Sequence, residues 1–173
     1  MEFKGATFLY TLAGLMITFA GFSALLLALR PAAGATLSML DRYLAKTVMT
    51  YIFVLTAGAL LPALFALYNI QEKLIWRGSG VLFGLPMLSL QVTYPRRHRK
   101  VVGKGPPPAV FVVFGSAVTL AMLGYVLEGL QYSAAAYITA LTIDFFTVAF
   151  AYVVALDVIM QQPMEVSERP VPD

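Results

Sequence analysis

The sequence predicts an all-α integral membrane protein, a single bundle of five transmembrane helices. Three observations lead to this fold class: long apolar runs, few charges, and an uneven distribution of Lys and Arg along the chain. Of the 173 residues, 60% are hydrophobic and only 12% are charged, whereas a soluble domain carries about 25% charged residues. Too few polar side chains remain to cover a globule in water, so a lipid bilayer is the expected solvent.

The first expected span covers about residues 6–29. This run has no charged residue before Arg30, and it is long enough to cross a bilayer, which takes about 20 residues. A cleaved signal peptide is the competing interpretation. Its apolar core would be shorter, roughly 7–15 residues, and its start would be more basic than Lys4 with Glu2. We therefore predict a true span.

The second expected span covers about residues 43–69. Ser38 and Asp41 before it form the pattern of a helix start, because a serine side chain can cap an early backbone N–H and an acidic residue is favoured at the positive helix end. Pro62 lies inside this span. Because proline removes a hydrogen-bond donor and clashes with the preceding turn, it predicts a kink there.

The third expected span, about residues 75–94, is the weakest by hydrophobicity. Its apolar run, residues 78–94, is at the short end of spanning length. Trp76 and Tyr94 near its two ends suit the membrane interfaces, and Pro86 in its middle predicts a second kink. A re-entrant segment is the alternative to a full crossing.

The fourth and fifth expected spans cover about residues 109–130 and 134–160, with a short turn between them. Residues 1–162 then form one transmembrane domain without a second, soluble domain. The tail, residues 163–173, combines prolines with mixed charge and is expected to be disordered in the cytoplasm.

Orientation follows from the positive-inside rule, under which cytoplasmic loops carry an excess of Lys and Arg. With five spans, three of the 12 basic residues fall on one side of the membrane: Lys4, Lys73 and Arg77. The other nine fall on the opposite side. The N-terminus is therefore predicted outside and the C-terminus in the cytoplasm, in what we take to be the bacterial cytoplasmic membrane. The asymmetry would be lost if the third segment did not cross or the first were cleaved.

Asp144 is the most informative polar residue, because it falls near the bilayer midplane. The fifth span rises about 1.5 Å per residue from its outer end, which puts Asp144 some 15 Å deep. A carboxylate there costs on the order of 2.5–3.5 kcal/mol. Tyr137 and Thr147 share its helix face with small residues, as in a helix–helix seam. Two interpretations stay open: a proton or cation site, and a protonated aspartate that hydrogen-bonds across helices.

Two groups of charges lie nearer the membrane surfaces. Glu128, at the outer end of the fourth span, could form an outer ion pair with Arg77. A basic loop after the third span carries Arg96, Arg97, Arg99, Lys100 and Lys104. Besides setting the orientation, it predicts contact with anionic lipid head groups, which bind clusters of about 4–8 cations beside a span. Nucleic-acid binding is not expected, since no fold is present that would present bases to aromatic side chains.

Small residues recur at helical spacing in two of the spans. Gly80 and Gly84 in the third span match the close-packing glycine motif of membrane helices. Gly14, Thr18 and Gly21 form a similar set in the first span. A homodimer contact is the alternative for Gly80 and Gly84, but we expect both sets to pack within the bundle.

Enzymatic chemistry is not expected. The chain has no cysteine and one histidine, His98, and no residues have the spacing of a metal site or of a nucleophile with its base. No cofactor or metal is therefore predicted. The leading prediction is an accessory, scaffold or sensor-type membrane subunit that acts with a protein partner through helix packing and its basic loop. The alternative is a small proton- or cation-coupled transporter or channel that uses Asp144.

Overall fold

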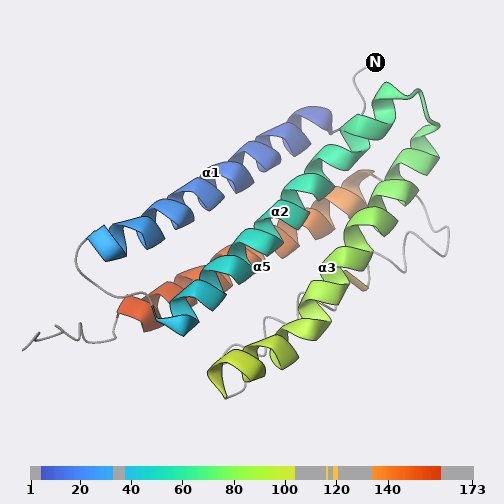
Figure 1. Ribbon diagram of the computed structural model, residues 1–173. Coiled ribbons are helices and arrows are strands. Elements are labelled where there is room, and N and C mark those ends of the chain that lie inside the picture. Colours follow the sequence, from blue (N-terminus) through green and yellow to red (C-terminus); the bar gives the residue numbers. More distant parts are fainter. Residues whose placement is uncertain (1–4, 33–37, 104–115, 117–118, 121–133, 161–173) are drawn as a thin grey trace, which may run out of the picture.

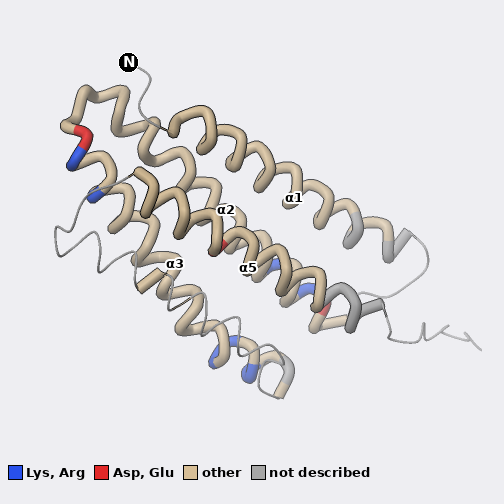
Figure 2. Tube along the Cα trace, turned by 180° about the vertical axis from the view of Figure 1, so that it is seen from behind, with Lys and Arg blue, Asp and Glu red and all other residues tan. Residues whose placement is uncertain are grey.

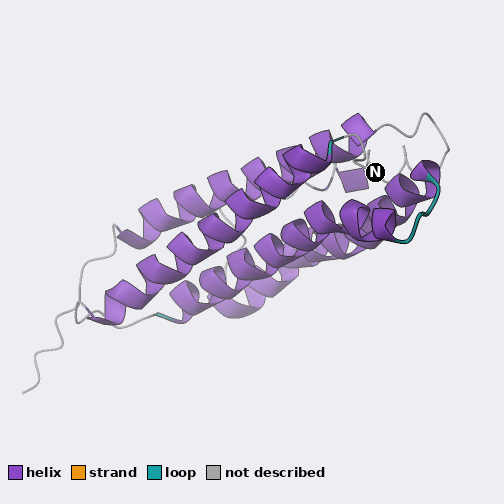
Figure 3. Cartoon of the chain, turned by 90° about the horizontal axis from the view of Figure 1, so that it is seen from above, coloured by secondary structure: helices purple, strands orange, loops and turns teal. Residues whose placement is uncertain are grey.

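The computed structural model describes residues 5–32, 38–103, 116, 119–120 and 134–160. Nearly all of these lie in four long helices, namely α1 (Ala6–Ala32), α2 (Met39–Leu67), α3 (Glu72–Val102) and α5 (Ala134–Met160). No strand occurs among the described residues (Figure 3). The predicted all-helical class is confirmed. Most of the expected fourth span and the whole tail lie outside the described residues.

The four helices form an elongated bundle (Figure 1). The helices α1, α2 and α3 follow one another in up-and-down order, and α5 lies behind α2. The central helix is α2, which contacts each of the other three. Its buried side chains recur every three or four residues, as one face of a helix requires; they include Val48, Ile52, Leu55 and Ala59.

The start of α2 is the capping box that the sequence predicts. The Ser38 hydroxyl accepts a hydrogen bond from the backbone N–H of Asp41 at 3.1 Å, and the Asp41 carboxylate accepts one from the backbone N–H of Ser38 at 3.0 Å. Two donors that a helix start would leave unpaired are thus satisfied. The helix then continues through Pro62 without interruption.

Three of the helices are long and apolar enough to cross a membrane: residues Ala6–Leu25 of α1, Met39–Leu67 of α2, and Ala134–Val154 of α5. Large apolar side chains on all three point outward. Phe22, Phe53 and Phe150 are each more than half exposed. Contiguous apolar surface of this kind is rare on soluble monomers and is the normal lipid-facing surface of a membrane protein. The described helices therefore indicate a membrane protein.

The helix α3 is longer than the sequence predicts. It has 31 residues, or about 46 Å at 1.5 Å per residue, and runs without interruption from one end of the bundle to the other (Figure 1). Arg96 to Lys100 form its last turns, so the predicted loop at this position is wrong. Gly103, whose φ of 75° is left-handed, ends the helix as a C-cap.

The difference lies at Pro95, which is followed by more helix. A proline leaves the carbonyl four residues before it, here that of Gln91, without its helical donor. Membrane helices nevertheless tolerate proline, because local geometry and neighbouring groups can adjust around it, so a proline by itself does not end α3. The Arg97 guanidinium donates to the neighbouring backbone carbonyl of Leu90 at 2.8 Å.

Charged residues gather at the two ends of the bundle, while the middles of the helices carry few (Figure 2). Where α2 ends and α3 begins, the described basic residues are Lys73 and Arg77. The opposite end, where α2 begins and α3 ends, is called the basic end. Its described basic side chains are Arg42, Lys46, Arg96, Arg97, Arg99 and Lys100.

Candidate functional site

Asp144 lies in the middle of α5 and is turned into the bundle. Its side chain is fully buried, with 0% of its surface exposed. Ala140 and Leu141, one turn before it on the same helix, are buried as well. The face of α5 that carries Asp144 is therefore its packing face.

Two buried polar side chains meet the Asp144 carboxyl. The Gln91 amide, from α3, donates to Oδ1 of Asp144 at 3.2 Å. The Thr119 hydroxyl lies 3.0 Å from Oδ2 of Asp144 and 3.1 Å from the amide oxygen of Gln91. These three residues, all buried, are called the Asp144 cluster. They bond α5 to α3 and to the stretch of chain that holds Thr119.

The Asp144 cluster has matched donors and acceptors when the carboxyl carries its hydrogen. A threonine hydroxyl has one hydrogen. If Thr119 gives that hydrogen to Gln91, its oxygen can accept one from Asp144, and within the cluster each of the three groups then donates once and accepts once. With an ionised carboxylate, the Thr119 hydroxyl would donate its hydrogen to Asp144 instead. The hydroxyl oxygen of Thr119 and the amide oxygen of Gln91 would then face each other with no hydrogen between them. The geometry therefore suits a neutral aspartic acid that bridges helices.

Tyr137 lies on the same face of α5, but it has a separate role. Its hydroxyl donates to the backbone carbonyl of Gly58 in α2 at 2.6 Å. In an α-helix that carbonyl would accept from the residue four positions later, which is Pro62 and has no N–H. Tyr137 thus supplies the hydrogen bond that Pro62 cannot make.

The tyrosine ring packs with two other aromatic side chains toward the end of the bundle where α2 ends and α3 begins. Its centroid lies 5.7 Å from that of Trp76 and 6.0 Å from that of Phe83. All three aromatic side chains are buried, and they are called the aromatic plug. Gly58 packs directly against it, since a Cβ atom there would lie 2.5 Å from a ring carbon of Phe83.

Thr147 does not join the Asp144 cluster. Its hydroxyl donates to the carbonyl of Ile143 in its own helix at 2.8 Å. The sequence groups Asp144, Tyr137 and Thr147 on one helix face. In the structure, each of the three has a different hydrogen-bond partner. Gln91 and Thr119, which complete the cluster, are absent from the sequence prediction. The available signal was that each is an uncharged polar residue inside an apolar run.

A second set of polar side chains, one buried histidine and two half-buried tyrosines, lies between α2 and α3 at the basic end. The ring centroids of Tyr43 and Tyr94 are 6.5 Å apart, and both lie within 6 Å of that of His98. His98 is only 4% exposed, although the sequence places it in a loop. It faces inward because the segment that carries it is helical.

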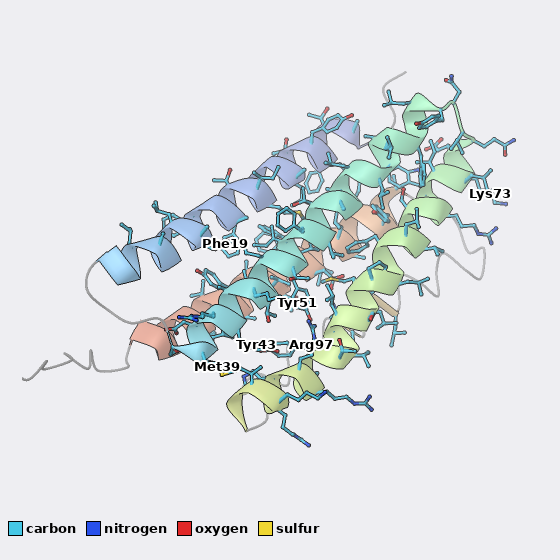
Figure 4. The ribbon with its side chains drawn as sticks, in the orientation of Figure 1. Phe19, Met39, Tyr43, Tyr51, Lys73 and Arg97 are labelled. Atoms are coloured by element: carbon cyan, nitrogen blue, oxygen red, sulfur yellow. The ribbon has the colours of Figure 1, made fainter. Side chains whose placement is uncertain are left out.

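Arg97 and Tyr51 are two further polar side chains between α2 and α3. Arg97 reaches back along α3 to the level of Leu90, one residue from Gln91. Tyr51 is buried on α2. Figure 4 shows the side chains of Tyr43, Tyr51 and Arg97 between α2 and α3.

The predicted lipid-contact residues divide into two groups. Arg96, Arg99 and Lys100 are exposed on the last turns of α3, whereas Arg97 is half-buried and bonded within the bundle. Lys104 lies outside the described residues. So does Glu128, and the predicted outer ion pair with Arg77 therefore stays a prediction.

The two glycine patterns also separate. Gly80 and Gly84 are buried, as expected for packing within the bundle. The prediction for the first span is wrong, because Gly14, Thr18 and Gly21 are exposed. A Cβ atom at either of these glycines would meet no described atom within 4 Å.

Within the described part of the chain, no three His, Asp or Glu side chains are grouped so that they could hold a metal ion. No protein-family model matches the chain, and comparisons with curated proteins and with solved structures find no significant similarity. The function is therefore inferred from the geometry of the bundle.

Proposed function

We propose that this chain is a non-enzymatic membrane subunit. It docks a transmembrane helix of a partner protein on the face of α1 that points away from the bundle. The observation that carries the proposal is the row of small residues on that face. In this proposal the chain crosses the membrane five times, with its N-terminus outside and its C-terminus in the cytoplasm.

The charges support this orientation. Of the described basic side chains, six lie at the basic end and two, Lys73 and Arg77, lie at the other. The positive-inside rule puts the basic end in the cytoplasm. The continuous course of α3 through the bundle supports a full crossing by the third segment, in place of a re-entrant turn.

The small-residue face of α1 consists of residues at three- and four-residue spacing, all of them exposed: Thr7, Thr11, Gly14, Thr18 and Gly21. The opposite side of the helix holds the buried side chains Leu9, Leu12 and Met16. The small-residue face therefore points directly away from the bundle.

Such a face suits another helix better than it suits lipid alone. Small side chains let two backbones approach closely, which is how membrane helices associate. The hydroxyls of Thr11 and Thr18 donate to carbonyls in their own helix, at 2.9 Å each, so these two side chains present mainly their methyl groups. Large exposed side chains flank the row on both sides: Phe8, Leu15 and Phe22 on one, and Tyr10 and Ile17 on the other. A partner helix would lie along the small-residue face between them.

The Asp144 cluster favours this subunit over the transport alternative. An ion path through the bundle would need to reach the carboxyl, but Asp144 is fully buried and both of its oxygens have partners. The matched donors and acceptors support a role in holding the helices together.

The basic end supports a second contact, with lipid. Arg96, Arg99 and Lys100 lie on one face of α3 at three- and four-residue spacing, and all are exposed. Each cation near an anionic membrane surface contributes about 1 kcal/mol of attraction. Anionic head groups at the cytoplasmic surface would therefore anchor this end of the bundle.

The docking face is tested by purifying tagged protein from native membranes. We compare wild type with a Gly14→Leu/Gly21→Leu double variant, which puts two large side chains on the small-residue face. The matched control is Ala57→Leu, which adds the same side chain at an exposed position of α2. We expect a partner to co-purify with wild type and with the control, and to be lost from the double variant.

Each other outcome has a clear meaning. Recovery of the same partners with all three proteins would remove the α1 face as the docking surface. Recovery of wild type only as a monomer would remove the subunit proposal itself. A homodimer that the double variant abolishes would show that the occupant is a second copy of this chain.

A further inference from the structure

We propose that Arg97 of α3 and Tyr43 of α2 form a binding site for one phosphate group at the basic end of the bundle. The site is distinct from the lipid contact of Arg96, Arg99 and Lys100, which are exposed. Arg97 and Tyr43 lie between α2 and α3 instead (Figure 4). Exposed cations attract any anion by their charge, whereas a site between two helices selects one chemical group by its hydrogen bonds.

The Arg97 guanidinium is a charge without a counter-charge. One of its five N–H groups donates to the backbone carbonyl of Leu90 at 2.8 Å. Its Nε atom is buried and has no hydrogen-bond partner among the described residues, and no described Asp or Glu forms an ion pair with it. A buried donor without an acceptor and a half-buried charge without a partner are both costly. An anion at this position would satisfy both.

The Tyr43 hydroxyl is the second unsatisfied group. Its oxygen is buried and has no hydrogen-bond partner in the described part of the chain. Thr47, one turn later on α2, is close but does not complete a bond with it. A phenolic hydroxyl can donate one hydrogen. One donor from α2 and one from α3 therefore lack an acceptor at the same end of the bundle.

Ring contacts bring these two donors together. The Tyr43 ring stacks on that of Tyr94, with centroids 6.5 Å apart, and lies edge-on to that of His98 at 5.8 Å. Tyr94 and His98 flank Arg97 on α3, three positions before it and one after. Arg97 is also close enough to Tyr43 to act on it electrostatically. The packed rings therefore hold the hydroxyl at the level of the guanidinium.

A phosphate group matches this pair of donors. It carries negative charge and several oxygens, so one oxygen can accept from the guanidinium while another accepts from the hydroxyl. The planar guanidinium is well suited to phosphate oxygens. Asp41 does not oppose an anion here. It lies two positions before Tyr43, on another side of α2, and its carboxylate accepts from the backbone N–H of Ser38 at 3.0 Å.

Two sources of phosphate exist at a membrane surface, namely a lipid head group and free phosphate in the water. Arg42 and Lys46 on α2 are exposed at the same end of the bundle. Their charge raises the local concentration of either anion. The chemistry of the site is the same for both sources, and separate titrations distinguish them.

The experiment is titration calorimetry of the full chain in a phosphate-free maltoside detergent. One series uses the water-soluble lipid dihexanoylphosphatidylglycerol, and the other uses inorganic phosphate. Tyr43→Phe removes only the hydroxyl, and Arg97→Lys keeps the charge but removes the guanidinium. We expect each variant to bind about tenfold more weakly than wild type, which is about 1.4 kcal/mol. A loss in the lipid series identifies a head group as the ligand, and a loss in the phosphate series identifies free phosphate.

Two matched controls make the same exchanges elsewhere. Tyr152→Phe removes another buried hydroxyl without a described hydrogen-bond partner, but Tyr152 packs against Phe19 of α1, with ring centroids 5.5 Å apart. Arg42→Lys changes an exposed arginine directly beside Tyr43 in the sequence. Both controls should bind either ligand as wild type does.

Three results would overturn the proposal. The first is equal affinity of wild type, Tyr43→Phe and Arg97→Lys for both ligands. The second is an equal loss in the two controls. The third is binding of oleate, an anion without phosphate, with the same dependence on Tyr43 and Arg97. If Arg97→Lys does not fold, as judged by circular dichroism, Tyr43→Phe still decides, because it removes a single oxygen atom.

The site and the surface contact with lipid can fail separately. Replacing Arg96, Arg99 and Lys100 removes charge from the surface of the basic end but leaves both donors of the site in place. The ratio of affinities between a protein with Tyr43 and its Tyr43→Phe variant should therefore be the same in that background as in wild type. A ratio of one in that background alone would overturn the separate site.

Discussion

Tyr137 supplies the hydrogen bond that Pro62 removes from Gly58. The proline leaves the Gly58 carbonyl in α2 without its helical donor, and the Tyr137 hydroxyl of α5 bonds to that carbonyl at 2.6 Å. A feature that would weaken α2 alone thereby becomes a bond between two helices. Neighbouring helices commonly satisfy backbone groups freed by proline in membranes.

This relationship predicts that Tyr137→Phe destabilises the protein by about 1–3 kcal/mol, the usual cost of a buried polar group left without its partner. The cost should shrink in a Pro62→Ala background, where the backbone N–H of residue 62 can bond to Gly58 instead. Unfolding in mixed detergent measures all four proteins of the cycle. An equal cost in both backgrounds would show that Tyr137 does not compensate for the proline.

The two kinds of glycine environment predict opposite effects of one substitution. Gly58→Ala puts a Cβ atom 2.5 Å from the Phe83 ring, and overpacking of this kind costs about 1–3 kcal/mol. Gly14→Ala meets no described atom within 4 Å and gains helix propensity of up to about 1 kcal/mol. The midpoint temperature of thermal unfolding of the isolated protein should therefore fall for Gly58→Ala and stay equal or rise for Gly14→Ala. The reverse order would contradict the packing of α2 against α3.

The exposed cations of α3 predict a preference for anionic lipid. A triple variant in which Arg96, Arg99 and Lys100 are each changed to glutamine should lose about 3 kcal/mol of attraction to anionic lipid, at about 1 kcal/mol per charge. Native mass spectrometry of the protein with bound anionic lipid measures the loss. Lys73→Gln, at the opposite end, is the control and should leave lipid binding at the basic end unchanged. Retention of the lipid by the triple variant would place its site elsewhere.

Membrane orientation can be read by single cysteines, because the chain has none of its own. Lys100→Cys marks the basic end and Gln71→Cys marks the other, and both positions are exposed. In intact cells, an impermeant maleimide should label Gln71→Cys and spare Lys100→Cys. Labelling of both from the same side would show that α3 does not cross the membrane.

The elements that the sequence predicts well are those that depend on neighbouring residues. The start of α2 follows from Ser38 and Asp41, three residues apart, because a capping box is a local structure. The helical class follows in the same way from long apolar runs. Polar residues that meet across helices are a different case: Gln91 and Thr119 reach Asp144 only after three parts of the chain have packed together.

The orientation of a helix about its own axis is also beyond a local pattern. Gly80 with Gly84, and Gly14 with Thr18 and Gly21, follow the same spacing rule, yet one set faces the bundle and the other faces away. The wrong prediction of a loop at Arg96 to Lys100 has a related cause. Pro95 is a local signal for the end of a helix, but α3 continues through it to Val102.

The bond between Tyr137 and Gly58 sets an order in which the sequence can change over generations. Losing Pro62 first restores a backbone donor, so a later loss of the tyrosine hydroxyl would cost little. Losing the hydroxyl first leaves the Gly58 carbonyl unpaired for as long as the proline remains. A homologue that has lost the hydroxyl at position 137 should therefore descend from an ancestor that had already lost the proline at position 62.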